Sequence, residues 1–188
     1  MSCTSRHFCI AAGNYQKTRG EVVPMALTWN GRTWKARRMP LPRTASLTTT
    51  EISAVDCQSS RLCVAVGDSS PSYAGGLLGL VELWNGSKWT ASAAPLPRRK
   101  RSRQTLLTGV ACPSAKSCTA IGNYITPAWV TTGFALTWSR GQWTATNAPE
   151  PGKYAPASDQ LSGISCPSTT LCAAGASISG GPAILTGP

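Results

Sequence analysis

Eight cysteines carry the most obvious chemistry in this sequence, because a thiol can bind a metal, act as a nucleophile or form a disulfide. They form four pairs of one spacing, C-x5-C, and the first cysteines of successive pairs lie 54, 55 and 54 residues apart. Zinc sites favour C-x2-C or mixed Cys/His ligands, and the only histidine is His7, so we expect no metal. No general base recurs beside the cysteines, which argues against a catalytic thiol. We therefore predict four local disulfides, which are Cys3–Cys9, Cys57–Cys63, Cys112–Cys118 and Cys166–Cys172.

The predicted disulfides also bear on where the protein works. Disulfides persist in oxidising compartments, so we expect a secreted or extracellular protein. Closing loops this short contributes about 2–2.5 kcal/mol per bridge in the chain-entropy account. The opening residues, MSCTSRHFCIAAG, have no sustained apolar run, so we expect no signal sequence within them. No stretch approaches the roughly 18 continuous apolar residues that indicate a transmembrane helix, so we expect no membrane insertion.

Carboxylates are too few to predict a hydrolytic centre. The chain has seven Asp and Glu, and a glycosidase needs two of them a few ångströms apart. Only Asp68 falls at a repeated position, the one that Asn14 and Asn123 occupy in other copies. A Ser-His-Asp triad cannot be argued around one histidine, and no GxxxxGK phosphate loop is present. We predict a protein that is not an enzyme and uses no cofactor, and a hydrolase remains open only if other sequence supplies carboxylates.

Aromatic side chains in three variable segments are the main candidates for ligand contact. These segments span residues 14–24, 68–78 and 123–133, and we expect them to be loops at one end of the molecule. Aromatic rings beside amides suit stacking on sugars, and they also anchor protein interfaces. The alternative is that each ring packs its own loop. The predicted ligand-binding residues are Tyr15, Tyr73, Tyr124, Trp129, Asn14 and Asn123.

Basic residues gather in two connecting segments, and the chain carries 18 Lys and Arg against 7 Asp and Glu, a formal net charge of +11 at pH 7. Such an excess indicates an anionic partner, unless the connectors are simply solvated loops. For an exported protein, a glycan or an anionic cell-wall polymer is favoured over nucleic acid, since basic and aromatic residues are not interleaved. The predicted contacts with an anionic partner are Arg37, Arg38, Arg98, Arg99, Lys100, Arg101 and Arg103.

An internal repeat supplies the elements that would position these residues. A complete copy has an apolar segment ending in cysteine, a second opening with the paired cysteine, and two segments that each carry a tryptophan. Asn30-Gly31 and Asn85-Gly86 predict tight hairpin turns with both central residues at positive φ. Helix formers are scarce, with only 13% charged residues, and 18 Gly and 14 Pro punctuate the chain, so we predict an all-β fold. The tryptophans at the repeat period, expected to fill the wedge between adjoining sheets, are Trp29, Trp34, Trp84, Trp89, Trp138 and Trp143.

Four short strands in each copy of about 54 residues are typical of a β-propeller blade. The motifs resemble the tryptophan-rich, disulfide-bearing propeller repeats of secreted bacterial proteins, whose consensus has the form V-S-C-x5-C-x-A-V-G … W-N-G-x-x-W. The resemblance covers all four copies, although it fixes no activity. We predict one propeller domain over residues 1–188, with roughly 3.5–4 blades at about 1–43, 44–97, 98–151 and 152–188.

The two ends of the repeat are incomplete. The first copy lacks most of its first segment, and the last, ending in GPAILTGP, lacks both tryptophans. We expect a second copy, a protein partner or a longer polypeptide to complete the propeller. The function predicted first is a lectin-like, non-enzymatic binding module that recognises a cell-surface glycan or cell-wall polymer through the variable loops. The alternative is a structural subunit of an extracellular assembly, joined through open blade edges and basic connectors.

Overall fold

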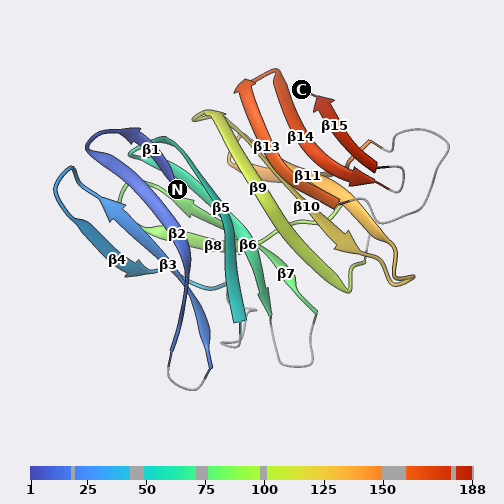
Figure 1. Cartoon of the computed structure of the whole chain (residues 1–188), viewed down its shortest axis with the longest axis horizontal. Helices are drawn as coiled ribbons and strands as arrows, with labels where there is room; N and C mark the ends of the chain where they lie inside the picture. Colours follow the sequence, from blue (N-terminus) through green and yellow to red (C-terminus); the bar gives the residue numbers. More distant parts are fainter. Residues whose placement is uncertain are drawn as a thin grey trace.

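The computed structural model of the chain describes residues 1–17, 20–42, 49–70, 76–97, 101–149, 160–178 and 181–187. Within these ranges the protein is all-β, with fifteen strands and no helix, as the composition predicts (Figure 1). The same ranges accordingly contain no helix of the length and apolarity needed to cross a membrane.

The strands form four antiparallel groups, in which each strand pairs with the next along the chain. We call these groups units 1 to 4. Unit 1 comprises β1 (Ser2–Ser5), β2 (Phe8–Gln16), β3 (Val22–Trp29) and β4 (Trp34–Arg38). Unit 2 comprises β5 (Thr49–Ser59), β6 (Leu62–Ser70), β7 (Leu78–Trp84) and β8 (Trp89–Ala93). Unit 3 comprises β9 (Gln104–Ser114), β10 (Ser117–Ile125), β11 (Thr131–Ser139) and β12 (Gln142–Asn147). Unit 4 comprises β13 (Gln160–Ser168), β14 (Leu171–Ile178) and β15 (Gly181–Gly187).

Successive units pack side by side through their first strands, β5 against β9 and β9 against β13 (Figure 1). A single parallel pair, Val22 with Thr49, also joins units 1 and 2 into one sheet. The first strands of all four units line one hollow of about 290 Å³, to which β1 contributes Ser2 and β5 contributes Asp56. Among the described strands, β1 pairs only with β2 and β15 only with β14, so strand pairing does not close the units into a ring.

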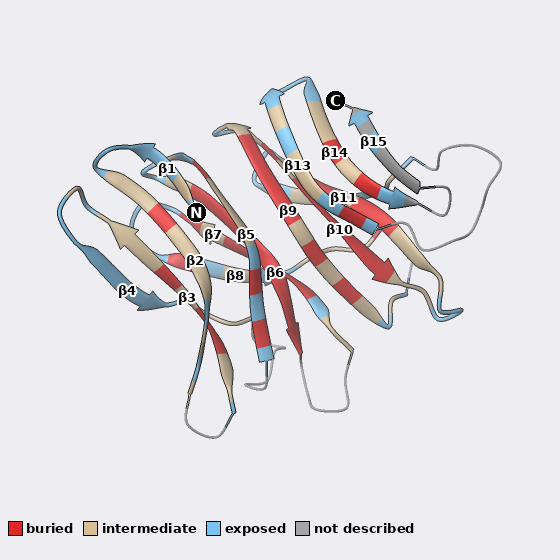
Figure 2. Ribbon diagram, viewed as in Figure 1, coloured by how far each residue is buried: buried red, intermediate tan, exposed pale blue. Residues whose placement is uncertain are grey.

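The hydrophobic core consists of three layers, one between each pair of adjoining units (Figure 2). Alternation along β6 explains how one strand serves two layers, because successive side chains point to opposite faces. Val64 and Val66 pack toward unit 3, whereas Cys63 and Ala65 pack toward unit 1. Strands in the middle of the molecule are therefore buried on both faces, which explains the uninterrupted apolar run LCVAVG at the start of β6.

All four predicted disulfides are confirmed. Each bridge joins the first strand of its unit to the second across a short turn, with Cα–Cα distances of 4.0, 3.9, 4.0 and 4.1 Å along the chain. The four bridges account for every cysteine of the sequence.

The tryptophan hairpins are also present, but two of their turns differ from the prediction. Trp29 pairs with Trp34 across a four-residue loop in which only Gly31 has positive φ, at 91°. The side-chain Oδ1 of Asn30 accepts hydrogen bonds from the backbone N–H groups at 32 and 33, at 3.0 and 2.9 Å. The Asn85-Gly86 turn is built in the same way. The prediction of positive φ at both central residues was therefore wrong for these turns, because the asparagine side chain, not its backbone, closes the loop.

Candidate ligand-binding site

Trp129 is the most exposed tryptophan of the described chain, with 69% of its surface accessible. It stands in the loop after β10 with φ at 63°, a left-handed conformation that a bulky residue rarely adopts. Thr126 holds the loop in place: its N–H donates to the Val130 carbonyl and its carbonyl accepts from the Trp129 N–H, both at 2.9 Å. The Thr126 hydroxyl accepts a third bond from the Val130 N–H at 3.2 Å. The strained backbone thus presents an indole ring to solvent.

Arg103 lies over this ring, with its guanidinium carbon 4.4 Å from the ring centre. Two further contacts fix the arginine: its Nε donates to the Pro127 carbonyl at 3.2 Å, and its backbone N–H donates to the Ile125 carbonyl at 2.8 Å. The structure therefore brings together one member of the predicted basic run and one predicted loop aromatic. The sequence separation of 26 residues gave no signal of this contact, which depends on β9 and β10 being neighbours in one sheet.

This arrangement can act in two ways on a ligand. A flat indole offers an apolar surface for stacking on the C–H face of a sugar. A guanidinium held beside it can donate paired hydrogen bonds to a carboxylate or a phosphate. Since Arg103 is already ordered by the backbone carbonyl of Pro127, less side-chain entropy is lost when a ligand binds.

The other residues of the predicted basic run are placed only in part. Arg101 is exposed and lies two residues before Arg103. Arg98, Arg99 and Lys100 lie outside the described residues, and so does the loop residue Tyr73.

Tyr124 does not lie in a loop, contrary to the prediction. It belongs to β10 and is only 1% exposed, with its ring edge-on to Phe134 at a centroid distance of 5.7 Å. Its hydroxyl donates to the Asn147 side chain at 3.1 Å. Tyr15 likewise lies in a strand, at the end of β2, and is half-buried. Both strands run further than the sequence pattern indicated, which leaves Trp129 as the exposed aromatic of its segment.

Asn14 and Asn123 connect neighbouring units. The Oδ1 of Asn14 accepts a hydrogen bond from the Ile52 N–H at 2.8 Å, and the Oδ1 of Asn123 accepts one from the Leu161 N–H at 2.8 Å. In both cases the acceptor lies on the second strand of a unit and the donor on the first strand of the next. The same 38-residue separation in both pairs shows a repeated structural link between units, which is visible only once the units are packed.

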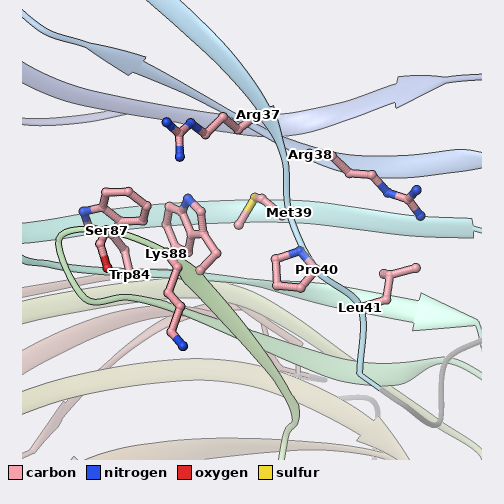
Figure 3. A pocket seen from close by; sticks show the side chains of 9 residues that line it. Arg37, Arg38, Met39, Pro40, Leu41, Trp84, Ser87 and Lys88 are labelled. Atoms are coloured by element: carbon pink, nitrogen blue, oxygen red, sulfur yellow. The ribbon is translucent and has the colours of Figure 1, made fainter.

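A second cluster of predicted residues lines a groove of about 380 Å³ between units 1 and 2 (Figure 3). We call it the basic groove. Both Trp84 and Trp89 line it but are almost fully covered, since they are 7% and 8% exposed, and their rings pack 5.6 Å apart. Trp34, by contrast, is 44% exposed. The lining residues are Arg37, Arg38, Met39, Pro40 and Leu41 from unit 1 and Trp84, Ser87, Lys88 and Trp89 from unit 2.

The sequence pattern did not indicate that two acidic side chains, Asp68 and Glu82, are buried. Glu51 and Asp68 face each other across β5 and β6, and burial, with a further contribution from Glu51, raises the pKa of Asp68 to about 6. Glu82 is completely buried, neither of its carboxyl oxygens has a hydrogen-bond partner among the described residues, and burial raises its pKa to about 8. Its place in the apolar run LVELW of β7 is the signal that could have revealed it. No cluster of three or more potential metal ligands occurs in the part of the chain that the structure describes.

The chain matches no protein-family model and no curated protein sequence. The assignment of function therefore depends on the geometry of these surfaces.

Proposed function

We propose that the protein is a secreted, non-enzymatic β-propeller binding module that recognises a cell-surface glycan or cell-wall polymer, with Trp129 and Arg103 as its principal contacts. The observation that carries this proposal is the strained, hydrogen-bonded loop that holds an exposed indole under an ordered guanidinium. Backbone strain at a surface position is retained where the surrounding structure enforces it, and such positions cluster at ligand contacts.

Three features support the propeller architecture. The units are consecutive antiparallel groups of up to four strands, the arrangement of propeller blades. Their first strands surround one hollow. Asparagine side chains link each of two units to the first strand of the next in the same way.

The four disulfides support export from the cell, because structural disulfides persist in oxidising compartments and are rare where glutathione keeps thiols reduced. A cell-surface or extracellular ligand follows from that location, and the net charge of +11 favours a ligand that carries negative charge.

A glycan array probed with the parent protein, Trp129→Ala and Trp34→Ala tests the proposal. Trp34 is the matched control, because it is also an exposed tryptophan but lies on β4, in another unit. We expect the parent and Trp34→Ala to bind the same glycans, and Trp129→Ala to lose at least about ten-fold in affinity, as for other central aromatic contacts. Equal binding by all three proteins, or no binding to any glycan, would contradict the proposal.

A second candidate is a structural subunit completed by a strand from another chain. The register places Trp84 opposite Cys63 and Trp138 opposite Cys118, but Gly187 opposite Cys172, so unit 4 lacks the tryptophan found in the other units. An apolar pocket of about 380 Å³ lies between units 3 and 4, with Ile121, Leu161 and Ile164 among its lining residues. A tryptophan-bearing strand added to the open edge of β15 would cover it.

Light scattering of the native, non-reduced protein tests this second candidate. A mass near 19.7 kDa at micromolar concentration would count against completion by another copy, whereas a stable dimer that Thr186→Lys dissociates would favour it. Thr186 lines the pocket from β15 and is exposed, so the charged substitution should disrupt an assembly that uses this surface without removing a core side chain.

A further inference from the structure

The basic groove combines three cationic side chains with an apolar base. Arg37 and Arg38 end β4, and Lys88 precedes β8 in the neighbouring unit. In the view of Figure 3, Arg37 and Lys88 lie on opposite sides of Trp84, with Met39 and Pro40 beside them. The three cationic residues are exposed, whereas Met39 is 1% exposed and anchors the segment in the core layer between units 1 and 2.

The groove between units 2 and 3 provides an internal comparison, because it is built in the same way. Its walls are the outer strands of unit 2 and the tryptophan hairpin of unit 3. Counted from the second tryptophan of each hairpin, Ser92 corresponds to Arg37, and counted from the first, Gln142 corresponds to Lys88. Among the residues that the structure describes, none that lines this second groove is charged: its polar members are Thr90, Ser92 and Gln142. The fold therefore forms the groove without cations, and the charge of the basic groove is an addition.

Two structural explanations do not account for these cations. Charged residues on an exposed edge strand can prevent sheet-to-sheet aggregation. However, among the described strands β8 also pairs on one side only, and its sequence, WTASA, has no charge. Intramolecular ion pairing does not account for the cations either, because within the described ranges the one ion pair joins Lys17 and Glu21.

A carboxyl group that points into the same layer is held in its neutral form. Glu82 shares a face of β7 with Leu80 and Trp84, since alternate residues of a strand point the same way, and these two pack in the layer between units 1 and 2. Because burial raises the pKa of Glu82 to about 8, this carboxyl carries little negative charge at pH 7. Glu82 therefore does not compensate the positive charge of the groove from beneath.

We infer that the basic groove binds the acidic groups of an anionic cell-wall polymer, with Arg37 and Lys88 contacting carboxylate or phosphate and the apolar base contacting carbon atoms of the polymer. The class of polymer in this inference is taken from the proposed function, on which it rests, but the groove shares no residue with the Trp129 loop. A volume of about 380 Å³ lies in the range of small-ligand sites and suits a short segment of such a chain. Two separated contacts on one polymer would raise its affinity through effective concentration.

Calorimetric titration at low ionic strength tests the inference with three probes of matched length: an oligogalacturonate, an oligomer of glycerol phosphate and a neutral malto-oligosaccharide. The test variant is Arg37→Ala/Lys88→Ala, and the control is Arg32→Ala/Lys116→Ala, which removes the same charge at exposed positions outside the groove. We expect the test variant to bind at least one acidic probe about ten-fold more weakly than the parent, and the control to change little. Preference for the oligogalacturonate identifies carboxylate as the recognised group, and preference for the glycerol phosphate oligomer identifies phosphate.

Two further variants complete the experiment: one that introduces cations into the uncharged groove, and Trp129→Ala. Ser92→Arg/Gln142→Lys places cations at the corresponding positions of the uncharged groove, and we expect it to increase the number of oligomers bound per chain. We expect Trp129→Ala to retain oligomer binding, whatever the glycan array shows. That result would support binding in the groove even if the proposed role of Trp129 proved wrong. Binding of no acidic probe, or equal losses in the test and control variants, would overturn the inference.

Discussion

Burial raises the pKa of two acidic side chains in this protein, Glu82 and Asp68. Glu82 lies on β7 between Leu80 and Trp84, and both of its carboxyl oxygens are buried with no hydrogen-bond donor in the described part of the chain. An ionised carboxylate in such a place is costly, so the group keeps its proton well above the usual pH. Because Glu82 is neutral in the core, it does not reduce the positive charge of the surface.

The pH dependence of folding should reveal this acid. The folded protein keeps the Glu82 proton up to a pKa of about 8, whereas the unfolded chain loses it near 4.5, so the folded state binds more protons between these values. The free energy of unfolding should therefore fall as pH rises from 4.5 to 8, by at most about 1.4 kcal/mol per pH unit for this group. Asp68, whose pKa is about 6, adds to the same trend below that pH.

Urea unfolding between pH 5 and 8 provides the measurement, with Glu82→Gln as the comparison because it is neutral at every pH and similar in shape. We expect the variant to have a flatter profile than the parent and to be the more stable of the two at pH 8. Parallel profiles would show that Glu82 is not protonated in the folded protein.

At the scale of the strands, the glycine in the second strand of a unit has different surroundings from one unit to another. The first and second strands shift register near Gly67 in unit 2 and near Gly122 in unit 3, which marks a bulge. A Cβ atom at Gly122 would collide with the backbone carbonyl of Leu106, whereas one at Gly13, in the corresponding position of unit 1, would meet nothing within 4 Å.

These two glycines form a matched pair for substitution. Gly122→Ala should destabilise the protein by about 1–3 kcal/mol, since the backbone of β9 must move. Gly13→Ala should be neutral or stabilise by up to about 1 kcal/mol, since alanine restricts the unfolded chain and a strand interior gains from it. Thermal unfolding of both variants checks the difference, and similar midpoints would mean that the close approach in unit 3 is unimportant.

How far the sequence predicts the structure depends on whether a feature lies within one unit or between two. The disulfides and the tryptophan hairpins are local, so the period of 54–55 residues was enough to predict them. The burial of Tyr124 and the hydrogen bond from Ile52 to Asn14 arise between strands or units, and no local pattern encodes them. The Arg103–Trp129 contact falls in the same class, which is why the sequence indicated both residues but not their pairing.

Across the whole molecule, Asp56 is a side chain that ties three units together. Its Oδ1 accepts hydrogen bonds from the Ser2 hydroxyl in unit 1 and the Cys57 N–H in unit 2, both at 2.9 Å. Its Oδ2 accepts one from the Cys112 N–H in unit 3 at 2.8 Å. These donors lie close to the hollow on which the first strands converge, so the carboxylate holds three first strands in register.

Loss of this carboxylate should therefore weaken the contacts between units 1, 2 and 3 as well as the local structure of β5. We expect Asp56→Ala to lower the free energy of unfolding by about 3 kcal/mol, because hydrogen bonds to a charged acceptor are lost and the Cys112 N–H is left buried without its partner. Ser165 occupies the corresponding position of unit 4 and is exposed, so Ser165→Ala should change stability little. Denaturant unfolding of the two variants measures the difference, and equal stabilities would refute a linking role for Asp56.

The central claim, that the Trp129 loop contacts a glycan, is tested most directly by oxidative footprinting read by mass spectrometry. The protein is exposed to hydroxyl radicals alone and with a saturating concentration of the glycan selected by the array, and oxidation is quantified at Trp129 and Trp34. Both tryptophans are exposed in the free protein, so Trp34 serves as the internal control. We expect the glycan to protect Trp129 while Trp34 is oxidised at an unchanged rate. Equal oxidation of Trp129 with and without bound glycan would contradict the claim.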